Sequence, residues 1–138
     1  MVHLNWPDGM YKVQQRSPRG VIHHAILDNG NTSQRLPAGY REPVIIHLVQ
    51  QGIVIQRAYG TGVWGVMDII YDEESAIARM DLALMNPFYN LAFNNCEHFS
   101  NYVAYGVRFS SQVQAAVGIA AMVGLIAWNN QQNWSARY

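Results

Sequence analysis

The chain contains one cysteine, Cys96, which lies in the run Asn94-Asn95-Cys96-Glu97. This run predicts the first turn of a helix. Asn94 can cap the helix by accepting a hydrogen bond from an unpaired backbone N–H, and Glu97, three residues on, can complete a capping box. Unpaired N–H groups and the positive end of the helix dipole both favour a thiolate in such a turn. The pattern therefore indicates a nucleophilic cysteine with a lowered pKa, although a small core residue near a helix start would look the same.

A cysteine nucleophile needs a base, and the base needs a group that orients it. His23 and His24 are neighbours in a predicted strand, so their side chains point to opposite faces and one of them at most can meet Cys96. His47 lies in the next predicted strand, where it is either a core residue or the partner that holds the base in one tautomer. His98, two residues after Cys96, points to another face of the helix, and we interpret it as structural or solvent-facing.

Metal and nucleotide sites have little support in the sequence. One cysteine and scattered histidines lack the short ligand spacing of a zinc site. Gly60-Thr61-Gly62 lacks the rest of any nucleotide-binding fingerprint. We therefore expect neither a metal nor a cofactor.

The composition is poor in charge. Apolar residues make up 50% of the 138 residues and charged residues 13%, which is about half the usual share in globular proteins. Such a chain either buries most of itself or presents apolar surface to a partner or membrane. Nine basic and nine acidic residues cancel and form no basic run, which argues against direct nucleic acid binding. A single cysteine and an N-terminus without signal-peptide layout indicate a cytosolic location.

Five strands are predicted before any helix. They cover residues 10–14, 21–27, 44–49, 53–58 and 63–71, and the last is expected to bulge at Gly65. Strands followed by helices predict an α+β domain, in which an antiparallel β-sheet packs against helices on one side.

Two helices should follow the strands. Asp72 can cap the first, whose apolar face is expected to comprise Ile77, Met80, Leu84 and Met85. The second begins at the capped cysteine motif, carries Phe99 and Val103 on the face of Cys96, and ends at Gly106.

The C-terminal part is wholly apolar from Ala115 to Trp128, somewhat shorter than the roughly 20 residues of a full bilayer span. A helix packed on the domain is the default for this length; a helix at or shallowly within a membrane and a truncated span are the alternatives. We predict a domain over residues 1–110, an apolar helix over 111–128 and a polar, frayed tail over 129–138. The candidate membrane-contacting residues are Val117, Ile119, Met122, Val123, Leu125, Ile126 and Trp128.

The run Asn95-Cys96-Glu97-His98-Phe99, preceded by a histidine-bearing strand, resembles the H-box/NC pattern of the lecithin:retinol acyltransferase-like (LRAT-like) group. These proteins are circularly permuted relatives of papain and of NlpC-type peptidases. His23-His24-Ala25-Ile26 resembles the group's His-Trp strand, Ile46-His47-Leu48 its second histidine strand, and Tyr105-Gly106-Val107 the segment before its apolar C-terminal anchor. The resemblance covers nearly the whole chain and implies a permuted papain-like fold. His24 departs from it by replacing an aromatic residue, and the connection between the two histidine strands is longer than in the cellular enzymes.

The resemblance implies that Cys96 is the nucleophile, His23 the base and His47 its orienter, with His24 as the alternative base. Backbone N–H groups at the helix start would stabilise the oxyanion. That region would comprise Asn94, Asn95 and Glu97. Enzymes of this kind attack a phospholipid ester, hold the acyl group as a thioester and pass it to water or an amine.

A compact, divergent H-box/NC protein is similar to the picornaviral 2A proteins of the kobuvirus and parechovirus type, which are not proteases. This similarity implies that the protein supports viral RNA replication and encapsidation in the host cytoplasm. If it binds a membrane, that membrane would be a replication membrane. The partners would be viral or host replication proteins, or membrane lipid bound by the C-terminal helix. The alternative function is an active Cys–His phospholipase A or acyltransferase that forms an acyl-thioester on Cys96. RNA binding, the third hypothesis, would require steep salt dependence.

Overall fold

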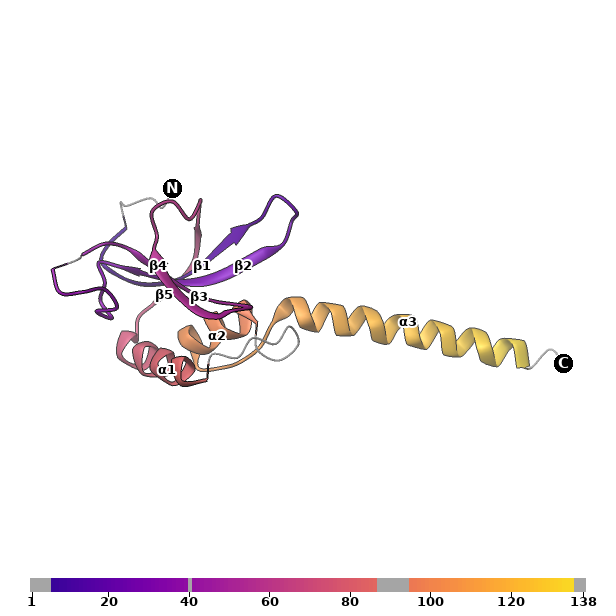
Figure 1. The fold of residues 1–138 in the computed structure, drawn as a ribbon. Helices are drawn as coiled ribbons and strands as arrows, with labels where there is room; N and C mark the ends of the chain where they lie inside the picture. Colours follow the sequence, from indigo (N-terminus) through magenta and orange to yellow (C-terminus); the bar gives the residue numbers. More distant parts are fainter. Residues whose placement is uncertain (1–5, 40, 87–94, 136–138) are drawn as a thin grey trace.

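A computed structural model describes residues 6–39, 41–86 and 95–135 (Figure 1). Five strands form one antiparallel sheet in the order β4-β3-β2-β1-β5. The strands are β1 (Gly9–Arg16), β2 (Ile22–Asn29), β3 (Val44–Val49), β4 (Gly52–Arg57) and β5 (Gly65–Ile70). Helices α1 (Glu73–Met85) and α2 (Cys96–Tyr105) cover one face of the sheet, and α3 (Ser111–Ser135) projects away from it. The predicted α+β class and antiparallel sheet are confirmed.

The strand ends differ from the predictions by two residues or fewer, but the bulge lies elsewhere than expected. β1 pairs Lys12 with Asp68 and Val13 with Val66, so Met67 is the extra residue rather than Gly65. Val66 packs on one face of the sheet and Ile70 on the other. In a regular strand, Val66 and Ile70 would share a face because they are four residues apart. One residue must therefore be inserted between them.

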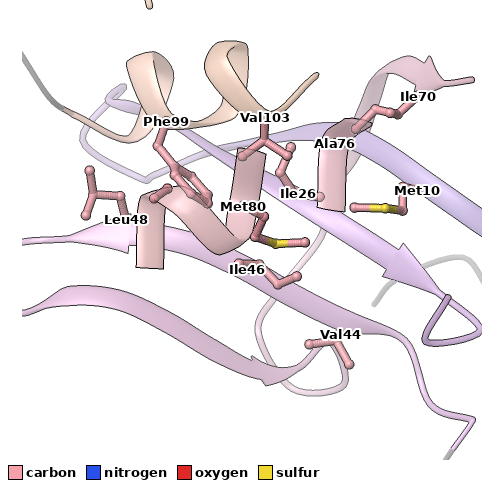
Figure 2. Close-up of a cluster of buried hydrophobic side chains, with 11 residues drawn as sticks. Met10, Ile26, Val44, Ile46, Leu48, Ile70, Ala76, Met80, Phe99 and Val103 are labelled. Atoms are coloured by element: carbon pink, nitrogen blue, oxygen red, sulfur yellow. The ribbon is translucent and has the colours of Figure 1, made fainter. Parts of the chain in front are cut away.

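The main core lies between the sheet and the pair α1 and α2. Figure 2 shows Phe99 and Val103 of α2 directed toward Ile26 of β2 and Met80 of α1. Removing such large side chains from water stabilises the domain by about 1.5–3 kcal/mol each. On α1 the small residues Ala76 and Ala83 face the core beside Met80, and Asp72 caps the helix as predicted. Met85 is 82% exposed, so its predicted place in the apolar face is wrong.

The opposite face of the sheet, which we call the second face, carries a smaller buried cluster. Its members are Tyr11, Val13, Ala25, Leu27, Ile45, Ala58 and Trp64. Alternation along the strands places His23 beside Ala25 and His47 beside Ile45 on this second face. His24 shares the other face with Ile26, beneath the helices.

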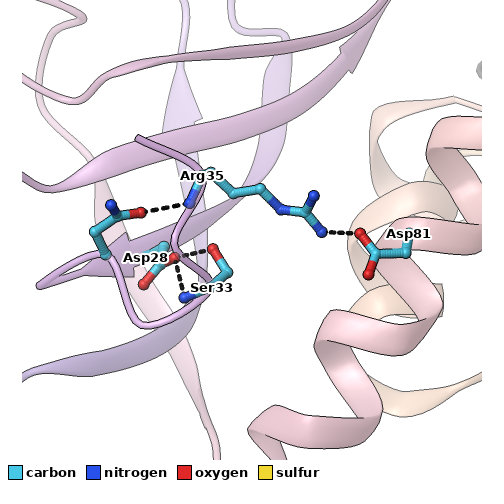
Figure 3. Close-up of polar contacts among 5 residues, drawn as sticks. Asp28, Ser33, Arg35 and Asp81 are labelled. Carbon is cyan, nitrogen blue, oxygen red and sulfur yellow. Dashed lines mark hydrogen bonds and ion pairs between the residues drawn. The ribbon is translucent and has the colours of Figure 1, made fainter. Parts of the chain in front are cut away.

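The end of the sheet near Asn29 and Gly9, which we call the far end, is closed by the loop over residues 30–39 and 41. Asp28 accepts hydrogen bonds from the backbone and hydroxyl groups of Thr32 and Ser33. Arg35 forms an ion pair with Asp81 of α1 (Figure 3). Asp28 thus fixes the loop to β2, and Arg35 fixes it to α1. A hollow of about 590 Å³ lies in this loop, at the opposite end of β2 from His24.

The packed position expected for the C-terminal helix is wrong. Among the described residues, α3 is the one helix long and apolar enough to cross a membrane, and no part of its candidate span Ser111–Asn129 is buried. The helix-facing side of the sheet is covered by α1 and α2, so that face is not free to receive α3. The helix also runs to Ser135, past the predicted end at residue 128, because residues 129–135 contain no glycine or proline to stop it.

Candidate active site at the start of α2

The cap of α2 is shifted by one residue from the prediction. Asn95 is the N-cap: its side chain accepts a hydrogen bond from the His98 N–H at 3.0 Å. His98 Nδ1 accepts one from the Asn95 N–H at 3.3 Å, so His98 closes the capping box in the role expected of Glu97. His98 is buried, which confirms its structural interpretation. Asn94 lies outside the described residues. Cys96 is therefore the first residue of the helix.

The Cys96 thiol lies against backbone donors of both α2 and the sheet. It accepts from its own N–H, from that of Glu97 and from that of His24 on β2. β2 pairs with β3 only over Ile26–Asp28, so the two strands separate at the level of His24. The sulfur therefore accepts from the backbone of β2 at a residue that has no paired partner on β3. The start of α2 is thereby joined to the sheet at a half-buried position.

The electrostatics of the thiol differ from the expectation. Burial raises the pKa of Cys96, the nearby charge of Glu97 adds to the rise, and the N–H donors offset them only in part. The predicted lowering of this pKa is therefore wrong, because desolvation outweighs the donors of the helix start. Cys96 is a protonated thiol at neutral pH.

His23 and His47 form a hydrogen-bonded pair on the second face. His23 Nε2 lies 2.6 Å from His47 Nδ1, and the Trp64 ring lies against both imidazoles. One of these nitrogens donates and the other accepts, so each ring fixes the tautomer of the other. Burial lowers the pKa of both, and for His47 burial and repulsion from His23 bring the pKa to about 4. The hydrogen bond predicted between these histidines is present, and both rings are neutral at pH 7.

His24 lies on the other face, beneath α2. It is 4% exposed, and within the described part of the chain its Nδ1 has no hydrogen-bond partner. Burial lowers its pKa, with opposing contributions from Glu97 and Lys12. The structure thus brings the His24 backbone to the Cys96 thiol, while the His23 ring belongs to the pair on the second face.

Comparisons with known protein families, curated proteins and solved structures found no match. Within the described ranges, no group of three or more His, Cys, Asp or Glu side chains is arranged to hold a metal ion.

The sequence analysis missed a polar layer beneath α2. Lys12 Nζ donates to Asn101 Oδ1 at 2.5 Å, and Asn101 donates to the Phe109 carbonyl at 2.9 Å. Lys12 is buried, and this burial lowers its pKa. Its position could have been found from the sequence, because Met10 and Lys12 fall on the same face of an alternating strand.

Glu97 has a role that its predicted place in a capping box concealed. Its buried carboxylate accepts from the hydroxyls of Ser110 at 2.5 Å and Ser111 at 2.6 Å, and from the Gln112 N–H at 3.3 Å. Burial alone would raise the pKa of Glu97, but these hydrogen bonds hold it at about 2. The ionised carboxylate on α2 therefore caps the N-terminus of α3. It fixes the start of the exposed helix beside Cys96.

Proposed function

We propose that this protein is a membrane-bound H-box/NC protein on an LRAT-like, permuted papain-like scaffold. In this proposal it is of the picornaviral 2A type and is not a protease. It supports viral RNA replication and encapsidation in the host cytoplasm through contacts made at replication membranes, with viral or host replication proteins as partners. The cysteine motif and the paired histidine strands support the scaffold. The observation that carries the membrane assignment is the exposed, apolar α3.

The dimensions of α3 fit a bilayer. Its 19-residue candidate span measures about 28 Å at 1.5 Å per residue, against the roughly 30 Å of the hydrocarbon core, and its wholly apolar part, residues 115–128, measures about 21 Å. A helix that lies on a membrane surface needs a polar face, whereas residues 115–128 are apolar on every side. Moving its seven large apolar side chains out of water is worth on the order of 10 kcal/mol. They are Val117, Ile119, Met122, Val123, Leu125, Ile126 and Trp128, all more than half exposed.

Flotation of the full chain with neutral phosphatidylcholine vesicles tests this proposal. We expect the protein to float with the vesicles and to resist extraction at alkaline pH. Ile119→Lys combined with Met122→Lys should abolish flotation, because each lysine costs about 2.5–3.5 kcal/mol near the bilayer centre. The matched control is Leu82→Lys with Met85→Lys, which adds the same charge at exposed apolar positions of α1. Flotation that both pairs reduce equally, or that neither reduces, would contradict insertion of α3.

Acyl transfer is a second candidate function, favoured by the hydrogen bond between His23 and His47. With a protonated thiol and a neutral imidazole, the resting state would not be an ion pair, so His23 would act as a general base. This function requires the His23 ring to reach Cys96 from the second face. The sulfur would then add to the ester carbonyl as its proton passes to His23, and the alcohol would leave with that proton. Water or an amine would release the acyl group from the thioester. Backbone N–H groups around Cys96 would stabilise the oxyanion.

Intact-mass measurement of the full chain in phospholipid–detergent micelles tests this second function. Turnover predicts an acyl adduct that is absent in Cys96→Ala and strongly reduced in His23→Ala. His47→Gln should reduce it less, because the glutamine can still orient His23. His24→Ala distinguishes the alternative base: loss of the adduct there, with a normal adduct in His23→Ala, would move the role to His24. If the unmodified chain forms no adduct, the Cys–His set does not turn over on phospholipid.

A further inference from the structure

The end of the sheet where α3 begins, which we call the α3 end, gathers several segments distant in sequence. The side chain of Gln112, in the first turn of α3, donates to the Ile22 carbonyl at the start of β2 at 3.5 Å. Gln15 donates to the Thr61 carbonyl at 2.9 Å, which holds the loop before β5 against the end of β1. In Figure 1 the β1–β2 turn and α3 project toward the same side of the domain. A bilayer entered by α3 would therefore face this turn and this loop.

Acids outnumber bases at the far end, where Arg35, Arg41 and Arg57 also lie; Asp68 lies opposite Lys12 in the middle of the sheet, and Asp81 pairs with Arg35. Arg16 and Arg19, in and beside the β1–β2 turn, are exposed, and no ion pair of either is found among the described residues. Near the α3 end, the ionised carboxylate of Glu97 is buried and held by the Ser110 and Ser111 hydroxyls. The acids of the far end belong to the loops and helix start beside Gly9 and Asn29. They are Asp8, Asp28, Glu42, Asp72, Glu73 and Glu74.

Exposed apolar side chains accompany the two arginines. Val21 in the β1–β2 turn is 60% exposed, and Val63 in the loop before β5 is 64% exposed. Basic side chains mixed with apolar ones are typical of surfaces that rest in the head-group region of a membrane. Arginines also bind RNA, but RNA binding would not explain why exposed apolar side chains lie beside them at the N-terminal end of α3.

We propose that the α3 end rests on the bilayer entered by α3 and binds anionic phospholipid head groups through Arg16 and Arg19, an inference that rests on the proposed function. The capping of α3 by Glu97 holds the domain in one orientation relative to the helix axis, so the β1–β2 turn is kept at the membrane surface. Val21 and Val63 enter the head-group region beside the arginines.

The test uses the full chain in lipid nanodiscs, with a nitroxide at Val21→Cys in a Cys96→Ser background. Docking lowers the access of a water-soluble nickel relaxation agent to this label. In discs with 30% phosphatidylserine we expect the docked form to dominate, and in phosphatidylcholine discs much less so. Arg16→Gln with Arg19→Gln should lower the ratio of docked to undocked form in the serine discs about 30-fold, equivalent to about 1 kcal/mol for each arginine. High salt should remove the same preference.

The matched control is Arg41→Gln with Arg57→Gln, which removes two positive charges at the far end and should leave docking unchanged. Equal nickel access in both lipids, or an equal effect of the control pair, would overturn the proposal. Loss of binding to a single-stranded RNA in the Arg16/Arg19 variant, with unchanged docking, would overturn it in favour of RNA. A second label at Leu125→Cys distinguishes failure of this proposal from failure of the proposed function. Nickel access at that position would contradict insertion of α3, and with it the proposed function.

Discussion

Glu97 offers a sharp test of how the domain holds α3. Replacing it by alanine removes the acceptor of two hydroxyl donors and one backbone N–H. Hydrogen bonds to a charged group contribute about 1.5–3 kcal/mol each, and the Ser110 hydroxyl, which is buried, would lose this acceptor. Allowing for relaxation of the serines, we expect Glu97→Ala to destabilise the first turn of α3 by about 3 kcal/mol.

The pKa of Glu97, which the same hydrogen bonds lower, gives an estimate of the same size. A fall from 4.5 to about 2 corresponds to about 3 kcal/mol at neutral pH. Because the folded-state pKa lies below the unfolded one, this stabilisation is fully present above pH 4.5. It is lost as the pH falls toward 2. Acidification over that range should therefore reproduce the effect of the substitution.

Hydrogen exchange of the full chain in detergent micelles measures this effect locally. We expect amides 112–116 to exchange about 100-fold faster in Glu97→Ala, since about 3 kcal/mol corresponds to roughly two factors of ten. In Glu97→Gln, which keeps one acceptor oxygen, these amides should exchange at a rate between those of the unmodified chain and Glu97→Ala. Glu74→Ala, an exposed acid in the first turn of α1, is the control and should leave these amides unchanged. Unaltered exchange in Glu97→Ala, or equal acceleration in the control, would refute the role of this carboxylate.

Three further predictions concern the site and the ends of its elements. Alkylation of Cys96 by iodoacetamide at pH 7.4 should be at least about tenfold slower than that of free cysteine, because burial raises its pKa; a faster rate would show an activated thiolate. The free energy of unfolding should fall by about 2 kcal/mol as the pH falls from 6.5 to 4, because His47 is protonated in the unfolded chain before it is protonated in the folded one. This value is smaller than the full pKa shift implies, because the His47 ring is partly exposed to solvent. Thermal melts in detergent should show this loss diminished in His47→Gln, and an unchanged pH dependence would contradict it. Gly106→Ala should lower the Tm by about 4–8 °C, since φ is +77° at this C-cap; Gly118→Ala, in open space on α3, should change it little, and equal shifts would argue against backbone strain.

Local chemistry allowed the elements of the site to be predicted from sequence. The end of α2 at Gly106 follows from the backbone freedom of glycine, and its start was predicted within one residue, since Asn95 is the cap in place of Asn94. The opposite orientation of His23 and His24 follows from the two-residue period of a strand. Which of them would lie beneath the helices could not be predicted, because that depends on the face of the sheet that α1 and α2 cover.

The features that the sequence analysis missed depend on contacts between segments that are distant in sequence. The start of α2 suggested an activated thiol, but the burial of Cys96 in the folded domain reverses the direction of its pKa shift. Glu97 fits a capping box by spacing, yet its carboxylate meets Ser110 and Ser111 of the next helix. The length of the apolar tail favoured a packed helix, but whether a docking surface remains for it depends on how α1 and α2 occupy the sheet.

Insertion of α3 is tested most directly by a nitroxide scan of residues 117–126 in the full chain reconstituted into nanodiscs. The ratio of oxygen access to nickel access rises with depth in a bilayer. We expect a high ratio on every side of the helix, with a maximum near the middle of the span and no period of 3.6 residues. A periodic ratio with a water-exposed face, or nickel access at all positions, would contradict a helix that crosses the membrane.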